Sequence, residues 1–309
     1  MNEEKTKISV VIPTFNSEST IRDCLSSVLD QTLAPHHYEV IAVDSSTDRT
    51  PDIIREEFPR VRLIRAEKKM LPGPARNMGI GSAAAGLIMF IDSDCIAGKD
   101  ILERMLDRHR QGEHAAIGGA ILNGTPHSAI GWVDYLMSFS PFMPSMDERL
   151  VPQIPTCNAC YKADVLRQHG FFPSYDFLAE DLILNWRVFR GGARLLFDPS
   201  VKVTHINRTS LSYLLRHQWT LGWSFALALR CTDMSGQIFV RYPALAAFLP
   251  VLRLGSLVSR VARRDLKVLV LSLLLSPLYL VGACAWASGF FRGATMGDGE
   301  YRVRLEAKP

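Results

Sequence analysis

The stretch LIMFIDSDC, residues 87–95, joins an apolar run to two aspartates that stand one residue apart. Leu87–Ile91 has the length and composition of a buried strand, so Asp92 and Asp94 are expected where that strand leaves its sheet. In open α/β sheets, ligands bind at the carboxyl ends of the strands. Two carboxylates at that place can hold a divalent cation with positions left open for a phosphate. Since aspartate is also common in turns, the pair indicates a metal site only together with other features.

Strand-like and helix-like segments alternate along the first third of the chain, which favours βαβ units and a doubly wound sheet. The expected buried strands are Ile8–Ile12, Val40–Val43, Val61–Ile64 and Leu87–Ile91. The expected helices between and after them are 21–29, 51–58, 73–85 and 101–110. Polar side chains follow the strands at Asn16, Asp44 and Asp92. We expect these side chains at one edge of the sheet, where a nucleotide would bind.

The regular alternation stops after a further apolar segment, Ala115–Leu122. Helical spacing of apolar residues predicts helices at 131–142, 163–169, 180–190 and 210–229. Short apolar runs predict strands at 194–197 and 201–204. Glu180 and Asp181 open one of the expected helices, where the helix dipole favours negative charge. A helix N-terminus is therefore one explanation for this acidic pair.

Composition changes near residue 240, after which the chain is rich in Leu, Ala and Val. Val268–Phe291 carries no charged side chain and is long enough to cross a bilayer, although a buried core helix or helical hairpin is the alternative. Residues 243–261 form a second apolar run that contains Arg253 and Arg260. These charges favour an interfacial or re-entrant helix over a full crossing.

Basic residues separate the two apolar runs. Arg260, Arg263, Arg264 and Lys267 favour the cytoplasmic face of a membrane and anionic headgroups. Met1–Lys7 is polar, so we expect no secretory signal and a cytosolic location for the bulk of the chain. The net charge is only +4, and no basic stripe with interleaved aromatic residues is evident. We therefore expect no nucleic-acid partner.

The six cysteines are scattered along the chain. Cys157 and Cys160 alone have the C-x-x-C spacing of a metal or redox site, and no second pair completes a zinc site. In a reducing compartment such residues are usually small core side chains. We expect both cysteines to be buried rather than chemically active.

Five motifs, taken in order, resemble the glycosyltransferases of family 2, which have a GT-A fold. They are SVVIPTFN at 9–16, VDSSTDRT at 43–50, GPARNMGI at 73–80, DSD at 92–94 and AEDLILNWRVFRGG at 179–192. The resemblance implies an α/β fold of the GT-A nucleotide-diphospho-sugar transferase type, Rossmann-like with a mostly parallel sheet, followed by C-terminal membrane helices. The implied division is a catalytic domain and a membrane-associated region, at 1–235 and 236–309. The catalytic domain would comprise a nucleotide-binding half and an acceptor half, at 1–122 and 123–235.

The resemblance also implies a site for a nucleotide-sugar donor. Its residues would be Pro13, Thr14, Phe15, Asp44, Ser46, Arg76 and Asp92. Family members usually have Tyr where this chain has Phe15, so ring stacking survives and one hydrogen bond is lost. Asp44 would accept a hydrogen bond from the base, with an Asx turn as the alternative. Arg76 would pair with the diphosphate or brace the aspartates.

A metal and a base complete the implied site. Asp94 would be the principal ligand of Mn²⁺ or Mg²⁺, Asp92 would contact the ribose or the metal, and His205 would complete the coordination. The cation would neutralise charge on the departing nucleoside diphosphate. Asp181 would take the proton of an acceptor hydroxyl in a single displacement that inverts the anomeric centre. Glu180 beside it would act with it as a catalytic residue by raising its basicity.

Residues 156–172 are similar to the segment under the acceptor pocket of the family, with Asn158 as the polar contact. The Gln-x-x-Arg-Trp motif of processive synthases is absent, which favours single transfers. We expect a hexosyltransferase-type enzyme of cell-envelope polysaccharide synthesis, with a UDP-sugar as donor. It would act on a glycan or lipid-linked acceptor at the cytoplasmic face of the cell membrane. A membrane-bound scaffold without turnover and a nucleotidyltransferase are the alternatives.

Overall fold

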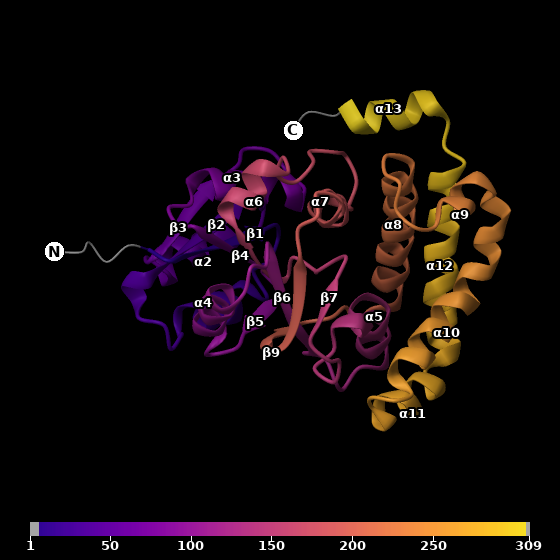
Figure 1. Ribbon diagram of the computed structural model, residues 1–309, viewed down its shortest axis with the longest axis horizontal. Helices are drawn as coiled ribbons and strands as arrows, with labels where there is room; N and C mark the ends of the chain where they lie inside the picture. Colours follow the sequence, from indigo (N-terminus) through magenta and orange to yellow (C-terminus); the bar gives the residue numbers. More distant parts are fainter. Residues whose placement is uncertain (1–5, 307–309) are drawn as a thin grey trace.

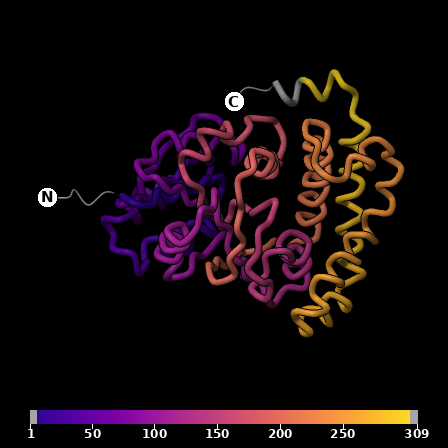
Figure 2. Tube along the Cα trace, in the orientation of Figure 1, coloured from indigo at the N-terminus to yellow at the C-terminus, as the bar shows by residue number. Residues whose placement is uncertain are grey.

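The computed structural model describes residues 6–306 of the chain (Figures 1 and 2). Its sheet begins with parallel strands in the order β3-β2-β1-β4. Their bounds are β1 Ile8–Thr14, β2 Tyr38–Asp44, β3 Val61–Arg65 and β4 Leu87–Ile91. The chain moves outward from β1 to β3 and then returns to the other side of β1. The carboxyl ends of β1 and β4 therefore border the crevice in which such sheets bind ligands.

Antiparallel pairing extends the sheet beyond β4. β8 (Asn158–Lys162) lies between β4 and β6 (Ala116–Asn123), and β9 (Leu195–His205) lies parallel to β6. The short strands β5 (Cys95–Ala97) and β7 (Arg149–Val151) both pair with β9. The strands expected at 194–197 and 201–204 are thus one strand, since a register shift against β6 accommodates the residues between them.

Helices pack around this sheet near their expected positions. The bounds are α1 Ile21–Leu29, α2 Thr50–Glu57, α3 Pro72–Ser82, α4 Ile101–Gln111, α5 Ala129–Phe139, α6 Ala163–Gln168 and α7 Glu180–Arg190. The helix expected to run to residue 142 ends earlier, with a 3-10 turn at Ser140–Phe142. β1 and β2 are buried along almost their whole length, as is typical of parallel strands with both faces covered.

Helices after β9 pack at one end of the sheet (Figure 1). They are α8 Leu211–Arg230, α9 Gln237–Arg241, α10 Leu249–Val261, α11 Leu266–Leu274, α12 Ser276–Ala294 and α13 Asp298–Glu306. α8 and α12 lie side by side and make the most extensive helix pair of the molecule. Their backbones meet at Gly222 and Gly289, where a Cβ atom would overlap a backbone oxygen of the facing helix. This close approach explains why both positions carry glycine.

The apolar segment at 268–291 is not one continuous helix. α11 and α12 divide it at Leu275, and their axes are bent by 73°. Pro277 explains the break, because proline cannot donate a backbone hydrogen bond and its ring clashes with the preceding turn. A 3-10 turn at Pro243–Phe248 leads directly into α10. By length and composition, the two together (Pro243–Val261) are the single helix within residues 6–306 that could cross a membrane. The bent α11–α12 pair would add a second span only if it crosses as one unit.

Candidate active site

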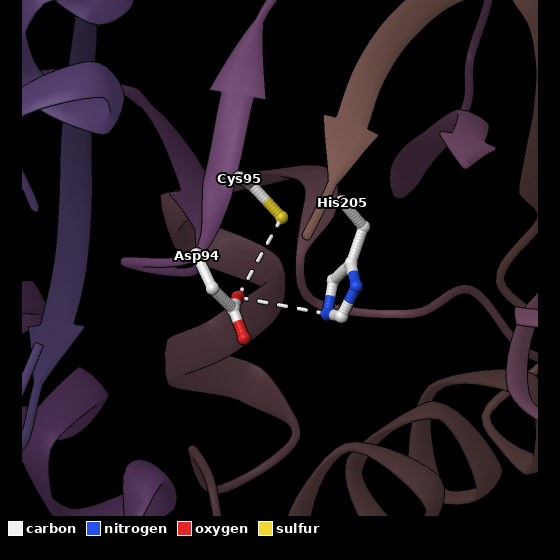
Figure 3. Close-up of side chains that lie close together, drawn as sticks. All are labelled: Asp94, Cys95 and His205. Carbon is white, nitrogen blue, oxygen red and sulfur yellow. Dashed lines mark hydrogen bonds and ion pairs between the residues drawn. The ribbon is translucent and has the colours of Figure 1, made fainter. Parts of the chain in front are cut away.

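The aspartates of the DSD motif follow β4 at the carboxyl edge of the sheet. β5 begins directly after Asp94 and pairs Cys95 with His205, the last residue of β9. The backbone N–H of Ile206 donates to the carbonyl oxygen of Asp94 at 2.9 Å. This pairing places Oδ1 of Asp94 3.5 Å from Nε2 of His205 (Figure 3). Strand pairing therefore brings together two of the predicted metal ligands that are far apart in the sequence.

Hydrogen bonds determine which nitrogen of His205 carries a proton. The backbone N–H of Thr125 donates to Oδ1 of Asn123 at 2.9 Å, and this oxygen also accepts from Nδ2 of Asn207 at 2.7 Å. The amide oxygen of Asn207 consequently faces Nδ1 of His205 at 3.0 Å, so Nδ1 must donate. In the neutral imidazole, Nε2 then directs a lone pair at the carboxylate of Asp94. Two acceptors that face one another in this way suit a shared cation.

The thiol of Cys95 completes a cluster with these two side chains. The potential ligand atoms of Asp94, Cys95 and His205 lie within 4.8 Å of one another (Figure 3). Burial raises the pKa of the Cys95 thiol well above its usual value, and the neighbouring Cys157 raises it further. A protonated thiol is a poor ligand, and Mg²⁺ and Mn²⁺ favour oxygen ligands. The carboxylate and the imidazole thus fit the predicted cation without the thiol.

Arg76 of α3 joins two acidic residues that belong to different motifs. Its Nη2 atom lies 2.7 Å from Oδ1 of Asp92, and its Nη1 atom lies 2.7 Å from Oε1 of Glu180. The arginine side chain is only 3% exposed, and its Nε atom is buried without a hydrogen-bond partner. Of the two predicted roles of Arg76, the structure shows the bracing of acidic residues. The ribose or metal contact of Asp92 stays a prediction.

Asp181 lies in the first turn of α7, next to Glu180. Its Oδ1 atom accepts a hydrogen bond of 2.7 Å from the backbone N–H of Leu182. Burial and, to a smaller extent, the negative charge of Glu180 together raise the pKa of Asp181 to about 7, against the opposing charge of Arg76. A carboxyl group with a pKa near 7 can take up a proton at neutral pH, which is the property of a general base.

A cavity of about 310 Å³ lies between these groups. Asp92, Asp94 and His205 line it from the sheet edge, and Glu180 and Asp181 line it from α7. The volume falls at the lower end of the range for ligand pockets. The predicted metal ligands and the predicted base therefore face one shared space.

Arg208 is a cavity residue that the sequence motifs did not identify. Its backbone N–H and its Nη1 atom donate to Oδ2 of the buried Asp134 at 3.0 and 3.3 Å, and its Nε atom is buried without a partner. Burial and the charge of Arg208 lower the pKa of the neighbouring His217 to about 3, so His217 is neutral. The signal in the sequence was the position of Arg208, three residues after His205 at the same sheet edge.

Asp44 lies outside this cavity, at the carboxyl end of β2. It is fully buried, and Oδ1 accepts hydrogen bonds of 2.6 Å from the hydroxyls of Thr14 and Ser46. The backbone N–H of Ser46 donates to Oδ2, and Arg65 forms an ion pair with the same oxygen. The alternative of an Asx turn is therefore present in the structure. A contact between Asp44 and a base stays a prediction.

The turn after β1 exposes an aromatic ring. Pro13 and Thr14 end β1, and the side chain of Phe15 is 37% exposed. The ammonium group of Lys69 lies 4.5 Å from the centroid of this ring. One face of Phe15 is thus covered by a cation that a stacking base would have to displace. The base-binding role of these residues stays a prediction.

Asn158 is not an acceptor contact. It is fully buried in β8, and its Nδ2 atom donates to the backbone oxygens of Ala120 and Val201 at 3.0 and 3.3 Å. These bonds satisfy the backbone where the register of β6 and β9 shifts, which explains a polar residue in the core. Cys157 and Cys160 are buried free cysteines, as expected.

Comparisons with known proteins show the family of this chain. Residues 9–170 match the model of glycosyl transferase family 2. The chain is 30% identical over 193 residues to the poly(ribitol-phosphate) beta-glucosyltransferase of Bacillus spizizenii. This alignment covers 59% of this chain and 29% of that protein. It is 28% identical to glycosyltransferase AglE of Haloferax volcanii, with 70% of this chain and 71% of that protein covered. The chain thus matches less than a third of the length of the Bacillus protein.

A solved structure shows the same fold at low sequence identity. It is the mannosyltransferase PcManGT from Pyrobaculum calidifontis in complex with GDP-Man and Mn²⁺. The two superpose with a TM-score of 0.64 at 18% identity, over 94% of this chain and 87% of that one. The α/β GT-A fold with C-terminal helices is thereby confirmed. The match to the family model confirms the predicted enzyme class, a glycosyltransferase. The chain belongs to glycosyl transferase family 2.

Proposed function

We propose that this protein is a metal-dependent, inverting glycosyltransferase that transfers single sugars. The donor is a nucleotide-sugar, with a UDP-sugar as our first choice, and the acceptor is a glycan or a lipid-linked molecule. The proposal rests on one observation above all. A single cavity brings Asp94 and His205 together with Asp181, which has a raised pKa.

Asp94 and His205 would hold Mn²⁺ or Mg²⁺, which would supply positive charge for the departing nucleoside diphosphate. Arg208 lines the same cavity, and its Nε atom has no hydrogen-bond partner. A guanidinium group pairs well with phosphate oxygens. Arg208 would therefore bind the diphosphate from the same sheet edge that carries Asp94 and His205. These groups together favour the departure of the nucleoside diphosphate, which gains one negative charge as it leaves with the electron pair.

Asp181 would act as the base. The acceptor oxygen forms a bond to the anomeric carbon while the bond from that carbon to the diphosphate breaks with its electron pair. The acceptor proton passes to the carboxylate of Asp181, whose raised pKa makes it a better proton acceptor than an ordinary aspartate. Because Arg76 binds Glu180, we propose Glu180 as a positioning residue that also sets this pKa.

Membrane attachment is part of the proposal. Val251 and Leu252 of α10 and Leu266 and Leu274 of α11 are each more than half exposed, although all four are large and apolar. Such a surface favours contact with lipid. We propose that residues 1–235 form the catalytic domain, with halves at 1–122 and 123–235. Residues 236–309 would attach it to the cytoplasmic face of the cell membrane.

The test is release of nucleoside diphosphate from a panel of UDP-, GDP- and dTDP-sugars by the full chain with Mn²⁺. Asp94→Ala should reduce release by about a thousandfold, because the leaving group loses its counter-charge. Asp52→Asn is the matched control, since Asp52 is an exposed carboxylate on α2 with no link to the cavity. Full release by Asp94→Ala, or no release from any nucleotide-sugar by the unmodified chain, would refute the proposal.

A further inference from the structure

A second and larger cavity, of about 530 Å³, borders the first. The two share Ser138, Leu178, Asp181 and Leu221 in their walls. Residues of α8, α10 and α12 form much of the second cavity, so it exists only where the C-terminal helices pack beside the catalytic residues. Asp181 stands at the boundary and faces both spaces.

The walls of this second cavity are mainly apolar and aromatic. Phe225, Phe239, Trp286 and Phe290 contribute rings to it. Within the described residues, the charged side chains that line it are Asp181 and Arg253. A cavity of this composition accommodates an apolar chain, and its polar groups determine which head group can enter with that chain.

Arg253 is a cation without a counter-charge in this wall. Its guanidinium carbon lies 4.4 Å from the ring centroid of Trp286, and its Nη2 atom donates to the backbone oxygen of Met137 at 3.3 Å. Its Nε atom is buried without a hydrogen-bond partner. No carboxylate within residues 6–306 forms an ion pair with it. Since a guanidinium stays charged, an anion in this cavity would satisfy it.

Arg260, on the same helix, is an arginine whose two Nη atoms both have hydroxyl partners. Its Nη1 atom donates to the hydroxyl of Ser140 at 2.8 Å, and its Nη2 atom donates to the hydroxyl of Ser256 at 3.0 Å. It does not line the second cavity. Arg253 keeps an unpartnered donor, Nε, although its side chain also hydrogen-bonds to Tyr279, and unlike Arg260 it lines the cavity.

The outer side of α10 carries apolar residues directly before Arg253. Val251 is 67% exposed and Leu252 is 54% exposed. One helix thus presents an apolar surface outward and a cation inward. An amphiphile that lies in a membrane could reach the cavity along this helix, whereas a free sugar would gain nothing from the apolar wall.

We infer that the second cavity binds the acceptor, and that this acceptor is an amphiphile with a phosphate group. The phosphate would pair with Arg253, the apolar chain would lie against Trp286 and Phe290, and the attacking hydroxyl would reach Asp181. This inference rests on the proposed function of Asp181 and names the class of acceptor for that site. The anomeric carbon exchanges its bond to the diphosphate for a bond to this hydroxyl oxygen, and Asp181 receives the proton.

The test measures binding of decyl phosphate and of decanol to the full chain by calorimetry, below the concentrations at which either aggregates. No nucleotide-sugar is present, so a failure of the proposed transfer reaction does not affect the result. The unmodified chain should bind decyl phosphate at least about tenfold more tightly than decanol, since a charged hydrogen bond is worth that factor or more. Inorganic phosphate at the same concentration should not compete, because it lacks the apolar chain.

Arg253→Gln should remove the preference for decyl phosphate over decanol. Arg253→Lys, which keeps the charge, should retain part of the preference, and Arg260→Gln should retain all of it. Equal binding of the two probes by the unmodified chain would overturn the inference. So would an unchanged preference in Arg253→Gln, or competition by inorganic phosphate alone.

Discussion

Two acidic pairs face the first cavity, and they share one arginine. Asp92 of the pair after β4 and Glu180 of the pair at the start of α7 each lie 2.7 Å from Arg76. The other members of the two pairs, Asp94 and Asp181, differ in their surroundings. Asp94 has the imidazole of His205 at 3.5 Å, whereas no ion pair with Asp181 occurs within residues 6–306.

This difference separates two kinds of chemistry that use the same residue type. Burial raises the pKa of both carboxyls, but the cation of Arg208 opposes the rise at Asp94, while the charge of Glu180 adds to it at Asp181. A carboxylate that faces the lone pair of an imidazole suits a cation, and one that is poised to take a proton suits a base. Arg76 makes the division possible because it neutralises the other member of each pair.

Asp181→Asn gives the strongest test of this division. Loss of the base should reduce sugar transfer by about 10²–10⁴-fold, because the amide cannot accept the proton. Binding of the nucleotide-sugar with Mn²⁺ should remain, since the predicted cation site is intact. Transfer rates measure the first effect, and titrations with the nucleotide-sugar on the same preparation measure donor binding. If Asp181→Asn loses donor binding as well as sugar transfer, the two acidic pairs are not separate in function.

Arg76→Lys should have the next largest effect. A lysine offers one point charge where the arginine bonds two carboxylates, so Asp92 or Glu180 would be left unpaired in a buried place. Removal of a partner from a buried ion pair costs about 3–5 kcal/mol, and a partial replacement should cost less than this range. Thermal unfolding measures the loss of stability. Arg22→Lys is the control, because Arg22 also pairs with a carboxylate but on the surface.

The bracing role of Arg76 shows where sequence reasoning succeeds and where it ends. The strand that ends at Ile91 and the helix that begins at Glu180 could be predicted, because each depends on a contiguous pattern of apolar residues. The link between them depends on the packing of α3 against α7. A Cβ atom at Gly73 would lie 3.0 Å from the side chain of Glu180, so the glycine permits this packing. No local pattern encodes such a distance.

Long-range pairing accounts for the other differences. Arg208 enters the cavity because β9 ends beside β5, and the sequence alone does not state which strands are neighbours. Asn158 was expected to be an acceptor contact because residues 156–172 resemble the segment under the acceptor pocket of the family, yet it bonds the irregular region of β6 and β9. The break before Pro277 was not predicted, because residues 268–291 were expected to cross the membrane as one segment. Its consequence, a bend of 73°, depends on how α11 and α12 pack.

Glu180→Gln should move the pH dependence of transfer. The charge of Glu180 raises the pKa of Asp181, so its removal should lower that pKa from its value of about 7. In the unmodified chain the rate should fall about tenfold per pH unit below this pKa, because a protonated carboxyl is not a base. The variant should keep a larger share of its activity at pH 6 than the unmodified chain does. A pH profile that is unchanged or moves to higher pH would contradict the coupling.

The smallest expected effect is on stability. The pKa of Asp181 is raised in the folded chain to about 7, so the folded state holds this proton more tightly than the unfolded state. The resulting stabilisation is fully present below pH 4 and is lost as the pH rises through about 7. Asp181→Asn has no proton to lose, so its melting temperature at pH 8 should exceed that of the unmodified chain by about 2–4 °C, and the difference should shrink toward pH 5. Asp52→Asn, at an exposed carboxylate, should show no such dependence. A lower melting temperature for Asp181→Asn at pH 8 would mean that the charged carboxylate stabilises the fold, and the contrast between Asp94 and Asp181 would then need another cause.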